Sequence, residues 1–153
     1  MHNIIIEQKI KSQSIANHLI NIQFTEEIKN TKRIKINNYK VESVDANAFD
    51  SCSNLKALLL NNNFIRCFQI NTKFNLNFLE NLSLESNFLK SIEPGVFSNL
   101  VNLKRLLLSE NQIQVIKENA FKGLTKLVEL NLRNNEISLI ESNSFNEAYF
   151  IVT

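Results

Sequence analysis

Apolar residues return along this chain at a fixed interval of 24 residues. Counting from residue 31, the fourth, sixth, eleventh and fourteenth positions of each interval are apolar five times in succession. The fourth position contains Ile34, Leu58, Leu82, Leu106 and Leu130. A regular interval of this length predicts a solenoid, because each repeat can bury its apolar face only against its neighbours.

Apolar fourth and sixth positions, separated by one residue, predict a short strand in every repeat. Stacked repeats bring these strands into one parallel sheet with a spacing of ~4.8 Å. The third, fifth, seventh and eighth positions then face outward, and most of them are polar. We therefore expect a sheet with one buried face and one face open to solvent.

Asparagine fills two further columns. At the ninth position the strand turns away, and a buried amide there can bond backbone groups that no strand partner reaches. We expect a structural Asn ladder of Asn63, Asn87, Asn111 and Asn135. The seventeenth position contains Asn47, Asn71, Gly95, Asn119 and Asn143. Both residue types tolerate positive φ and cap helices, so each repeat should carry a capped helical turn on its outer side.

A column of phenylalanine follows these turns. We expect an aromatic spine behind the sheet, made of Phe49, Phe97, Phe121 and Phe145. In the second repeat Lys73 occupies the spine position and Phe74 comes one residue later. This slip predicts a local distortion around residues 69–78.

Residues 103–113, LKRLLLSENQI, resemble the leucine-rich repeat core, whose pattern is L-x-x-L-x-L-x-x-N-x-L. Residues 116–124, IKENAFKGL, are similar to the later part of the typical 24-residue subclass. The resemblance implies an α/β repeat solenoid. In this fold a horseshoe arc carries a parallel β-sheet on its concave face and short helical turns or loops on its convex side.

The repeats define the expected domain organisation. Five repeats occupy residues 31–148 and begin at residues 31, 55, 79, 103 and 127. Residues 1–30 are interpreted as a degenerate N-terminal flank or first repeat, and residues 149–153 as the truncated start of a further repeat or a tail. Because Tyr149–Val152 is apolar and solenoids need polar caps, we expect a fragment of a longer repeat protein. Alternatively, this tail caps the stack or supports association through the uncapped C-terminal end.

Composition and charge exclude several function classes. The formal net charge is +2 and no Lys/Arg run is long, which argues against a nucleic-acid partner. No stretch approaches the ~18 apolar residues of a membrane span. The two glycines cannot form a phosphate-binding loop, and His2 and His18 lack neighbours at metal-ligand spacing. We therefore expect no catalytic residues, no metal, no cofactor and no enzymatic activity.

Two cysteines and one glycosylation motif bear on the cellular compartment. Cys52 falls in an apolar column and should be a buried small hydrophobe, whereas Cys67 falls on the other side of the coil. The expected separation exceeds the ~7 Å that a disulfide spans, so both should be free thiols. Asn81-Leu82-Ser83 is a sequon on the expected strand, where a glycan would cover the open face.

Apolar side chains interrupt the polar outward face. Leu59 and Leu107 point outward, and Phe64 and Phe88 occupy the tenth position of adjacent repeats. Exposed apolar groups near arginine are typical anchors of interfaces, although scattered ones are common on any surface. The predicted partner-binding residues are Leu59, Phe64, Phe88, Arg105, Leu107 and Arg133.

The resemblance implies a protein-interaction module that recognises a protein ligand or co-receptor through the concave sheet face. Its typical subclass points to an extracellular or receptor-type protein with an innate-immune, adhesion or guidance role. The alternative is an intracellular, cytoplasmic adaptor or scaffold, which the N-terminal sequence favours because it lacks a signal-peptide pattern. A third interpretation is a structural spacer with no ligand of its own.

Overall fold

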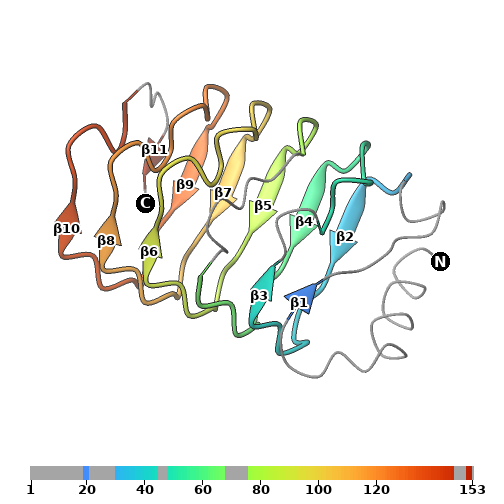
Figure 1. The fold of residues 1–153 in the computed structure, drawn as a ribbon, viewed down its shortest axis with the longest axis horizontal. Coiled ribbons are helices and arrows are strands. Elements are labelled where there is room, and N and C mark those ends of the chain that lie inside the picture. Colours follow the sequence, from blue (N-terminus) through green and yellow to red (C-terminus); the bar gives the residue numbers. More distant parts are fainter. Residues whose placement is uncertain (1–18, 21–29, 45–47, 68–75, 147–150, 153) are drawn as a thin grey trace.

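The computed structural model describes residues 19–20, 30–44, 48–67, 76–146 and 151–152. Its main feature is a parallel sheet of six strands in the order β2-β4-β5-β7-β9-β11 (Figure 1). These strands are β2 (Arg33–Lys35), β4 (Ala57–Leu59), β5 (Asn81–Ser83), β7 (Arg105–Leu107), β9 (Glu129–Asn131) and β11 (Ile151–Val152). The predicted stack of strands is therefore confirmed.

The register of this sheet follows the repeat. Ile34 pairs with Leu58, Leu58 with Leu82, Leu82 with Leu106, and Leu106 with Leu130. Each partner lies 24 residues further along the chain, so the same apolar column supplies every rung. The last strand pair departs from this interval: Val152 of β11 pairs with Leu130 of β9, which is 22 residues earlier in the chain.

Two smaller parallel sheets complete each turn of the coil. One comprises β6 (Ser91–Ile92), β8 (Val115–Ile116) and β10 (Leu139–Ile140), in the order β10-β8-β6. The other pairs β1 (Leu19–Ile20) with β3 (Ser43–Val44). The N-terminal flank thus contributes a strand that joins the first repeat. Whether the flank ends at residue 30 stays a prediction.

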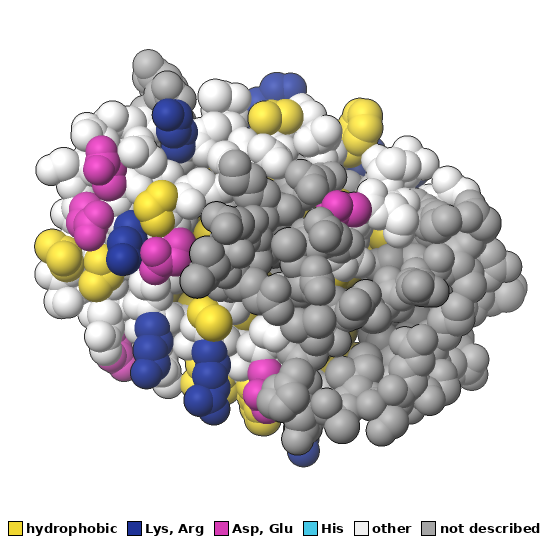
Figure 2. Space-filling model, in the orientation of Figure 1, with side chains coloured by type: hydrophobic (Ala, Val, Ile, Leu, Met, Phe, Trp, Pro, Cys, Tyr) yellow, Lys and Arg dark blue, Asp and Glu magenta, His cyan; other side chains and the backbone are white. Residues whose placement is uncertain are grey.

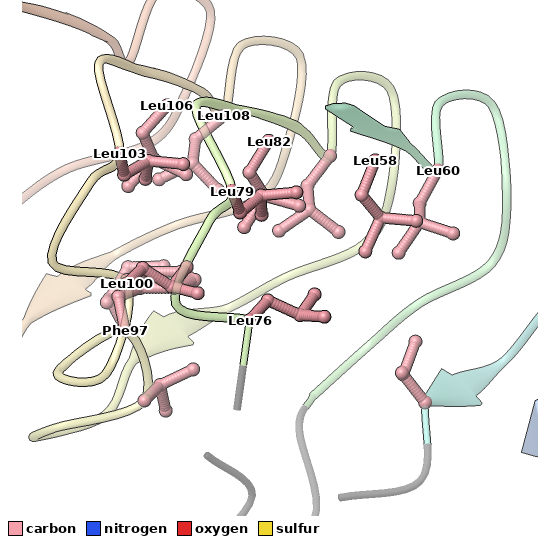
Figure 3. Packing of buried hydrophobic residues seen from close by; sticks show 14 of the residues in the cluster. Leu58, Leu60, Leu76, Leu79, Leu82, Phe97, Leu100, Leu103, Leu106 and Leu108 are labelled. Atoms are coloured by element: carbon pink, nitrogen blue, oxygen red, sulfur yellow. The ribbon is translucent and has the colours of Figure 1, made fainter. Parts of the chain in front are cut away.

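The core lies inside the coil, between these sheets. The fourth- and sixth-position residues from Ile34 to Leu132 are buried in every described repeat. Figure 3 shows Leu79, Leu82, Leu103 and Leu106 from successive repeats stacked beside one another. Stacking of like residues gives every repeat the same apolar neighbours above and below. Burial of a leucine side chain contributes about 1.5–3 kcal/mol to folding.

The outer side of the coil is made of turns. The described residues form no helix there, so of the expected short helical turns or loops only the non-helical form is seen. The turns close several bonds between residues three apart, such as Ser98 N–H to Gly95 O at 3.1 Å and Leu100 N–H to Phe97 O at 2.9 Å. These bonds do not begin at successive residues, so they do not propagate into a helix.

Positive φ at the seventeenth position is present as predicted. The φ angles are 72° at Gly95, 56° at Asn119 and 61° at Asn143, whereas Asn47 and Asn71 lie outside the described residues. Another glycine, Gly123, has a steric role that the sequence did not suggest. A Cβ atom there would lie 2.7 Å from the carbonyl oxygen of Ser98, so only glycine lets these two turns approach.

The aromatic spine is present behind the sheet. Phe49, Phe97 and Phe121 are buried, and the rings of Phe121 and Phe145 stack with centroids 5.2 Å apart. Lys73 and Phe74 lie outside the described residues, so the distortion expected at 69–78 stays a prediction.

The C-terminal end of the smaller sheet leaves apolar surface uncovered. Ile92 and Ile116 are 1% and 0% exposed, whereas the equivalent Ile140 is 52% exposed and Leu139 is 50% exposed. Figure 2 shows hydrophobic side chains at this β10 end of the molecule. Association through this end stays a prediction.

We expect the two thiols to differ sharply in reactivity. Both are free, with Cys67 exposed and Cys52 only 1% exposed. Desolvation by burial raises the pKa of the Cys52 thiol to about 11, against a weaker opposing hydrogen bond from Ser51. A chromogenic disulfide reagent at pH 8 should therefore label one thiol in the native protein and two in denaturant. The Cys67→Ser variant should show almost no native labelling, and equal rates for both thiols would contradict the packing of Cys52.

Candidate binding face

The Asn ladder supports the outward face at the ends of the strands. The Asn87 amide donates to the carbonyl oxygens of Leu60 and Leu84, both at 3.0 Å. Its Oδ1 accepts the backbone N–H of Ile65 at 3.1 Å. Asn63, Asn111 and Asn135 repeat this pattern with their own neighbours. Each ladder side chain therefore ties its own turn to the preceding one and faces the backbone.

A hollow of about 170 Å³ lies on the outward face of the sheet. Leu59 on β4 and Leu107 on β7 are half-buried, and both are paired in register with Ser83 on the intervening β5. Because serine is shorter than leucine, the surface between the two leucines is recessed. The lining comprises Arg33, Ala57, Leu59, Asn81, Leu82, Ser83, Arg105 and Leu107.

Two arginines stand at opposite ends of this hollow. Arg33 and Arg105 share one register row, with Ala57 and Asn81 between them. Three strand spacings separate them, which corresponds to ~14 Å between their backbones. Both side chains are exposed, and Arg105 Nε lies 3.3 Å from the carboxylate of Glu129. An exposed pair of this kind contributes little to stability, so Arg105 stays available to a ligand.

A partly buried carboxylate lies beside the hollow. Glu85 accepts hydrogen bonds from the hydroxyls of Ser109 at 2.6 Å and Ser83 at 3.1 Å. It also accepts the amide of Asn61 at 3.3 Å. These bonds link three adjacent repeats and restrict the side chains around the hollow. In the sequence, Glu85 belongs to a seventh position that is polar in every repeat, and this pattern alone indicates only a solvent-exposed sheet face.

The structure brings some of the predicted partner-binding residues together and separates others. Leu59, Arg105 and Leu107 line the hollow, and Arg33 joins them although it was not predicted. Phe64 and Phe88 form a separate edge-to-face pair beyond the Asn ladder, with centroids 5.7 Å apart and about 40% and 39% exposure. Arg133 is exposed and is not among the residues that line the hollow.

Neither a metal-ligand cluster nor a membrane-spanning helix occurs in the described ranges. No group of three or more His, Cys, Asp or Glu side chains there could hold a metal ion. No helix in those ranges is long and apolar enough to cross a membrane. His2 and His18 lie outside the described residues.

Two family matches cover most of the chain. Residues 77–137 match the leucine rich repeat family, and residues 3–74 match the BspA type leucine rich repeat region, which has six copies. No curated protein matches the sequence. The second match extends over the N-terminal flank, where β1 joins the stack.

Solved structures with the same fold are repeat proteins. The leucine-rich repeat domain of APL1 aligns with a TM-score of 0.73 and 23% identity, over 88% of this chain and 37% of that one. A chain of the Toll–Spätzle complex, a hub in Drosophila development and innate immunity, aligns with a TM-score of 0.71 and 19% identity, over 79% and 17%. A chain of the LRIM1/APL1C complex gives 0.66 and 20%, over 90% and 33%.

This chain spans roughly a sixth to a little over a third of those proteins. At identities of 19–23% the likeness concerns the fold. The parallel bridges, the two family matches and the structural alignments agree on that fold. The chain is a leucine-rich repeat protein whose strands recur at the interval of about 24 residues found in the typical subclass.

Proposed function

We propose that this repeat stack recognises a protein ligand or co-receptor through the outward face of its six-stranded sheet. The observation that carries the proposal is the hollow that Leu59 and Leu107 line together with two exposed arginines. Arginine is among the residue types that contribute most binding energy at protein interfaces, where such residues cluster in well-packed pockets. We further propose that this face is the concave side of a horseshoe arc and that Phe64 and Phe88 form its rim.

An extracellular or receptor-type setting agrees best with the structural relatives. Toll is described in a complex with Spätzle, and LRIM1 in a complex with APL1C. An innate-immune, adhesion or guidance role follows from this likeness as part of the proposal. A cytoplasmic adaptor is the competing interpretation, and secretion separates the two.

The first test asks whether the hollow binds a partner. The purified chain would be screened against an array of secreted and cell-surface proteins, and each hit would be confirmed with the purified pair. Replacing Leu59, Phe64, Phe88 and Leu107 with serine should weaken binding of a genuine partner at least tenfold. Val101→Ser, at a residue 44% exposed and outside the hollow, is the matched control. Equal affinity of both variants would contradict the proposal.

A second test concerns compartment and the Asn81 sequon. Asn81 lines the hollow and is half-buried on β5, so a glycan there would occupy the proposed binding surface. An immunoblot of the native product should find it in the medium and not in the cell extract. A product retained in the cytosol would favour the adaptor. If deglycosylation shifts the band of the native protein but not the band of the Asn81→Gln variant, Asn81 carries a glycan. That glycan would cover the hollow around Asn81 and exclude this part of the face as the partner-binding surface.

A further inference from the structure

A row of lysines lies along the edge where the chain enters each strand of the six-stranded sheet. The second position of successive repeats contains Lys32, Lys56, Glu80 and Lys104. From Lys56 onward, each of these residues donates its backbone N–H to the carbonyl of the preceding one at 2.8 Å. They are therefore consecutive rungs, ~4.8 Å apart. With Lys126, which comes two residues before the next rung, they form what we call the lysine row.

A second hollow of about 260 Å³ opens along this row. Its described lining comprises Lys56, Phe78, Glu80, Asn102, Lys104 and Lys126. None of these residues lines the hollow on the outward face, so the two sites are separate. Phe78 is 60% exposed, so its ring is accessible to a ligand in this hollow.

The charges of the row are only partly balanced. Glu80 lies 2.8 Å from both Lys56 Nζ and Lys104 Nζ. Hydrogen bonds from Lys104 and Lys56 lower the pKa of Glu80 to about 2, so this carboxylate is ionised at neutral pH. Lys126 Nζ donates to the neutral amide of Asn102 at 2.6 Å. Four lysines against one glutamate leave three positive charges uncompensated within the row.

We propose that the lysine row binds a sulfated glycan chain that runs along the edge of the sheet. Ammonium groups that follow one another from strand to strand along an edge complement a linear polyanion that presents sulfates at regular intervals. Phe78 offers an apolar surface against which a sugar ring can pack. A single-stranded nucleic acid would be expected to use several aromatic platforms and arginine, whereas the hollow is lined by one aromatic residue and its cations are all lysines.

Glu80 acts in this proposal as an internal counter-ion. Its carboxylate forms salt bridges with Lys56 and Lys104 in the free protein, so a sulfate must compete with it for these two ammonium groups. Removing the carboxylate while keeping the shape of the side chain frees both ammonium groups. The proposal therefore requires that Glu80→Gln binds the glycan more tightly than the native protein.

The test measures binding of a heparin-derived octasaccharide to the full chain by titration calorimetry at several salt concentrations. Replacing Lys104 and Lys126 with serine should weaken binding at least tenfold and flatten its salt dependence. The matched control replaces Arg66 and Lys90, two exposed cations beyond the other end of the strands, and should change affinity less than twofold. Glu80→Gln should strengthen binding several-fold, and thermal melting should show that all variants are folded.

Three results would overturn the proposal. One is an equal loss in both double variants, which would mean that only net charge matters. Another is unchanged or weaker binding by Glu80→Gln. A third is equal or tighter binding of an oligothymidylate with the same number of charges, which would point to nucleic acid. Serine substitutions at Leu59 and Leu107 should leave octasaccharide binding unchanged, so the outcome is independent of the proposed protein-recognition face.

Discussion

Replacing Asn87 with alanine is expected to lower the free energy of unfolding by about 3–5 kcal/mol. The change removes a buried amide that serves two repeats, and Asn87 itself is only 4% exposed. The carbonyl groups of Leu60 and Leu84 and the N–H of Ile65 lose this partner inside the stack. Each buried polar group left without a partner costs about 1–3 kcal/mol, and the cavity adds to the loss.

Urea denaturation followed by circular dichroism would measure this effect. The matched control is Asn54→Ala, which removes an exposed amide whose side-chain bond to Asn30 is 3.4 Å long. We expect the control to change stability by less than ~0.5 kcal/mol. A loss below ~1 kcal/mol for Asn87→Ala would mean that water replaces the amide and that the ladder is not a buried support. The slope of the unfolding free energy against urea concentration should be compared between the native protein and each variant, because a repeat stack can unfold in parts.

Replacing Phe97 with alanine is expected to destabilise the protein by about 3–5 kcal/mol, the range for buried phenylalanine in other cores. Phe97 is 0% exposed and lies with Leu76 and Leu100 in one apolar layer (Figure 3). Neighbouring turns cannot collapse into the cavity without breaking the strand register on the opposite side of the coil. The cost should therefore include the cavity as well as the lost apolar contact.

Phe88→Ala is the matched control for this prediction. It deletes the same atoms from a ring that is 39% exposed and contacts Phe64 at the rim. We expect a loss of about 1 kcal/mol from the aromatic contact and partial burial. Calorimetric melting of both variants would separate the two environments. Equal destabilisation would show that the spine is no better packed than the rim.

Part of the backbone geometry was not predictable from single columns. The eighth position has positive φ in every repeat, at Asn38, Asn62, Ser86, Glu110 and Asn134. Asparagine there is a recognisable signal, because its side chain tolerates this conformation. Serine and glutamate carry no such signal, and their conformation is imposed by the chain reversal and by the bonds of the neighbouring repeats. Ser86, for example, donates to the Glu110 carboxylate at 2.6 Å.

Periodicity along the chain was enough to predict the repeat interval, the strand register, the buried columns and the asparagine positions. These features depend on local alternation and on contacts between residues one repeat apart, and both are visible as periodicity. It also identified Leu59, Arg105 and Leu107 as outward residues, although their binding role remains a proposal.

Which outward residues share a surface became visible only in the folded stack. Arg33 and Arg105 are far apart in sequence but line one hollow, because Ala57 in their row and Ser83 between the two leucines are small. No run of basic residues predicted the lysine row, since its members come from separate repeats and meet only when the strands stack. The capping signals predicted short helical turns or loops on the outer side, and the described residues form turns whose bonds do not begin at successive residues, so no helix propagates. The local pattern thus predicts each strand and its buried residues. The shape and charge of the surface across the strands depend on side chains from separate repeats, which lie together only in the assembled stack.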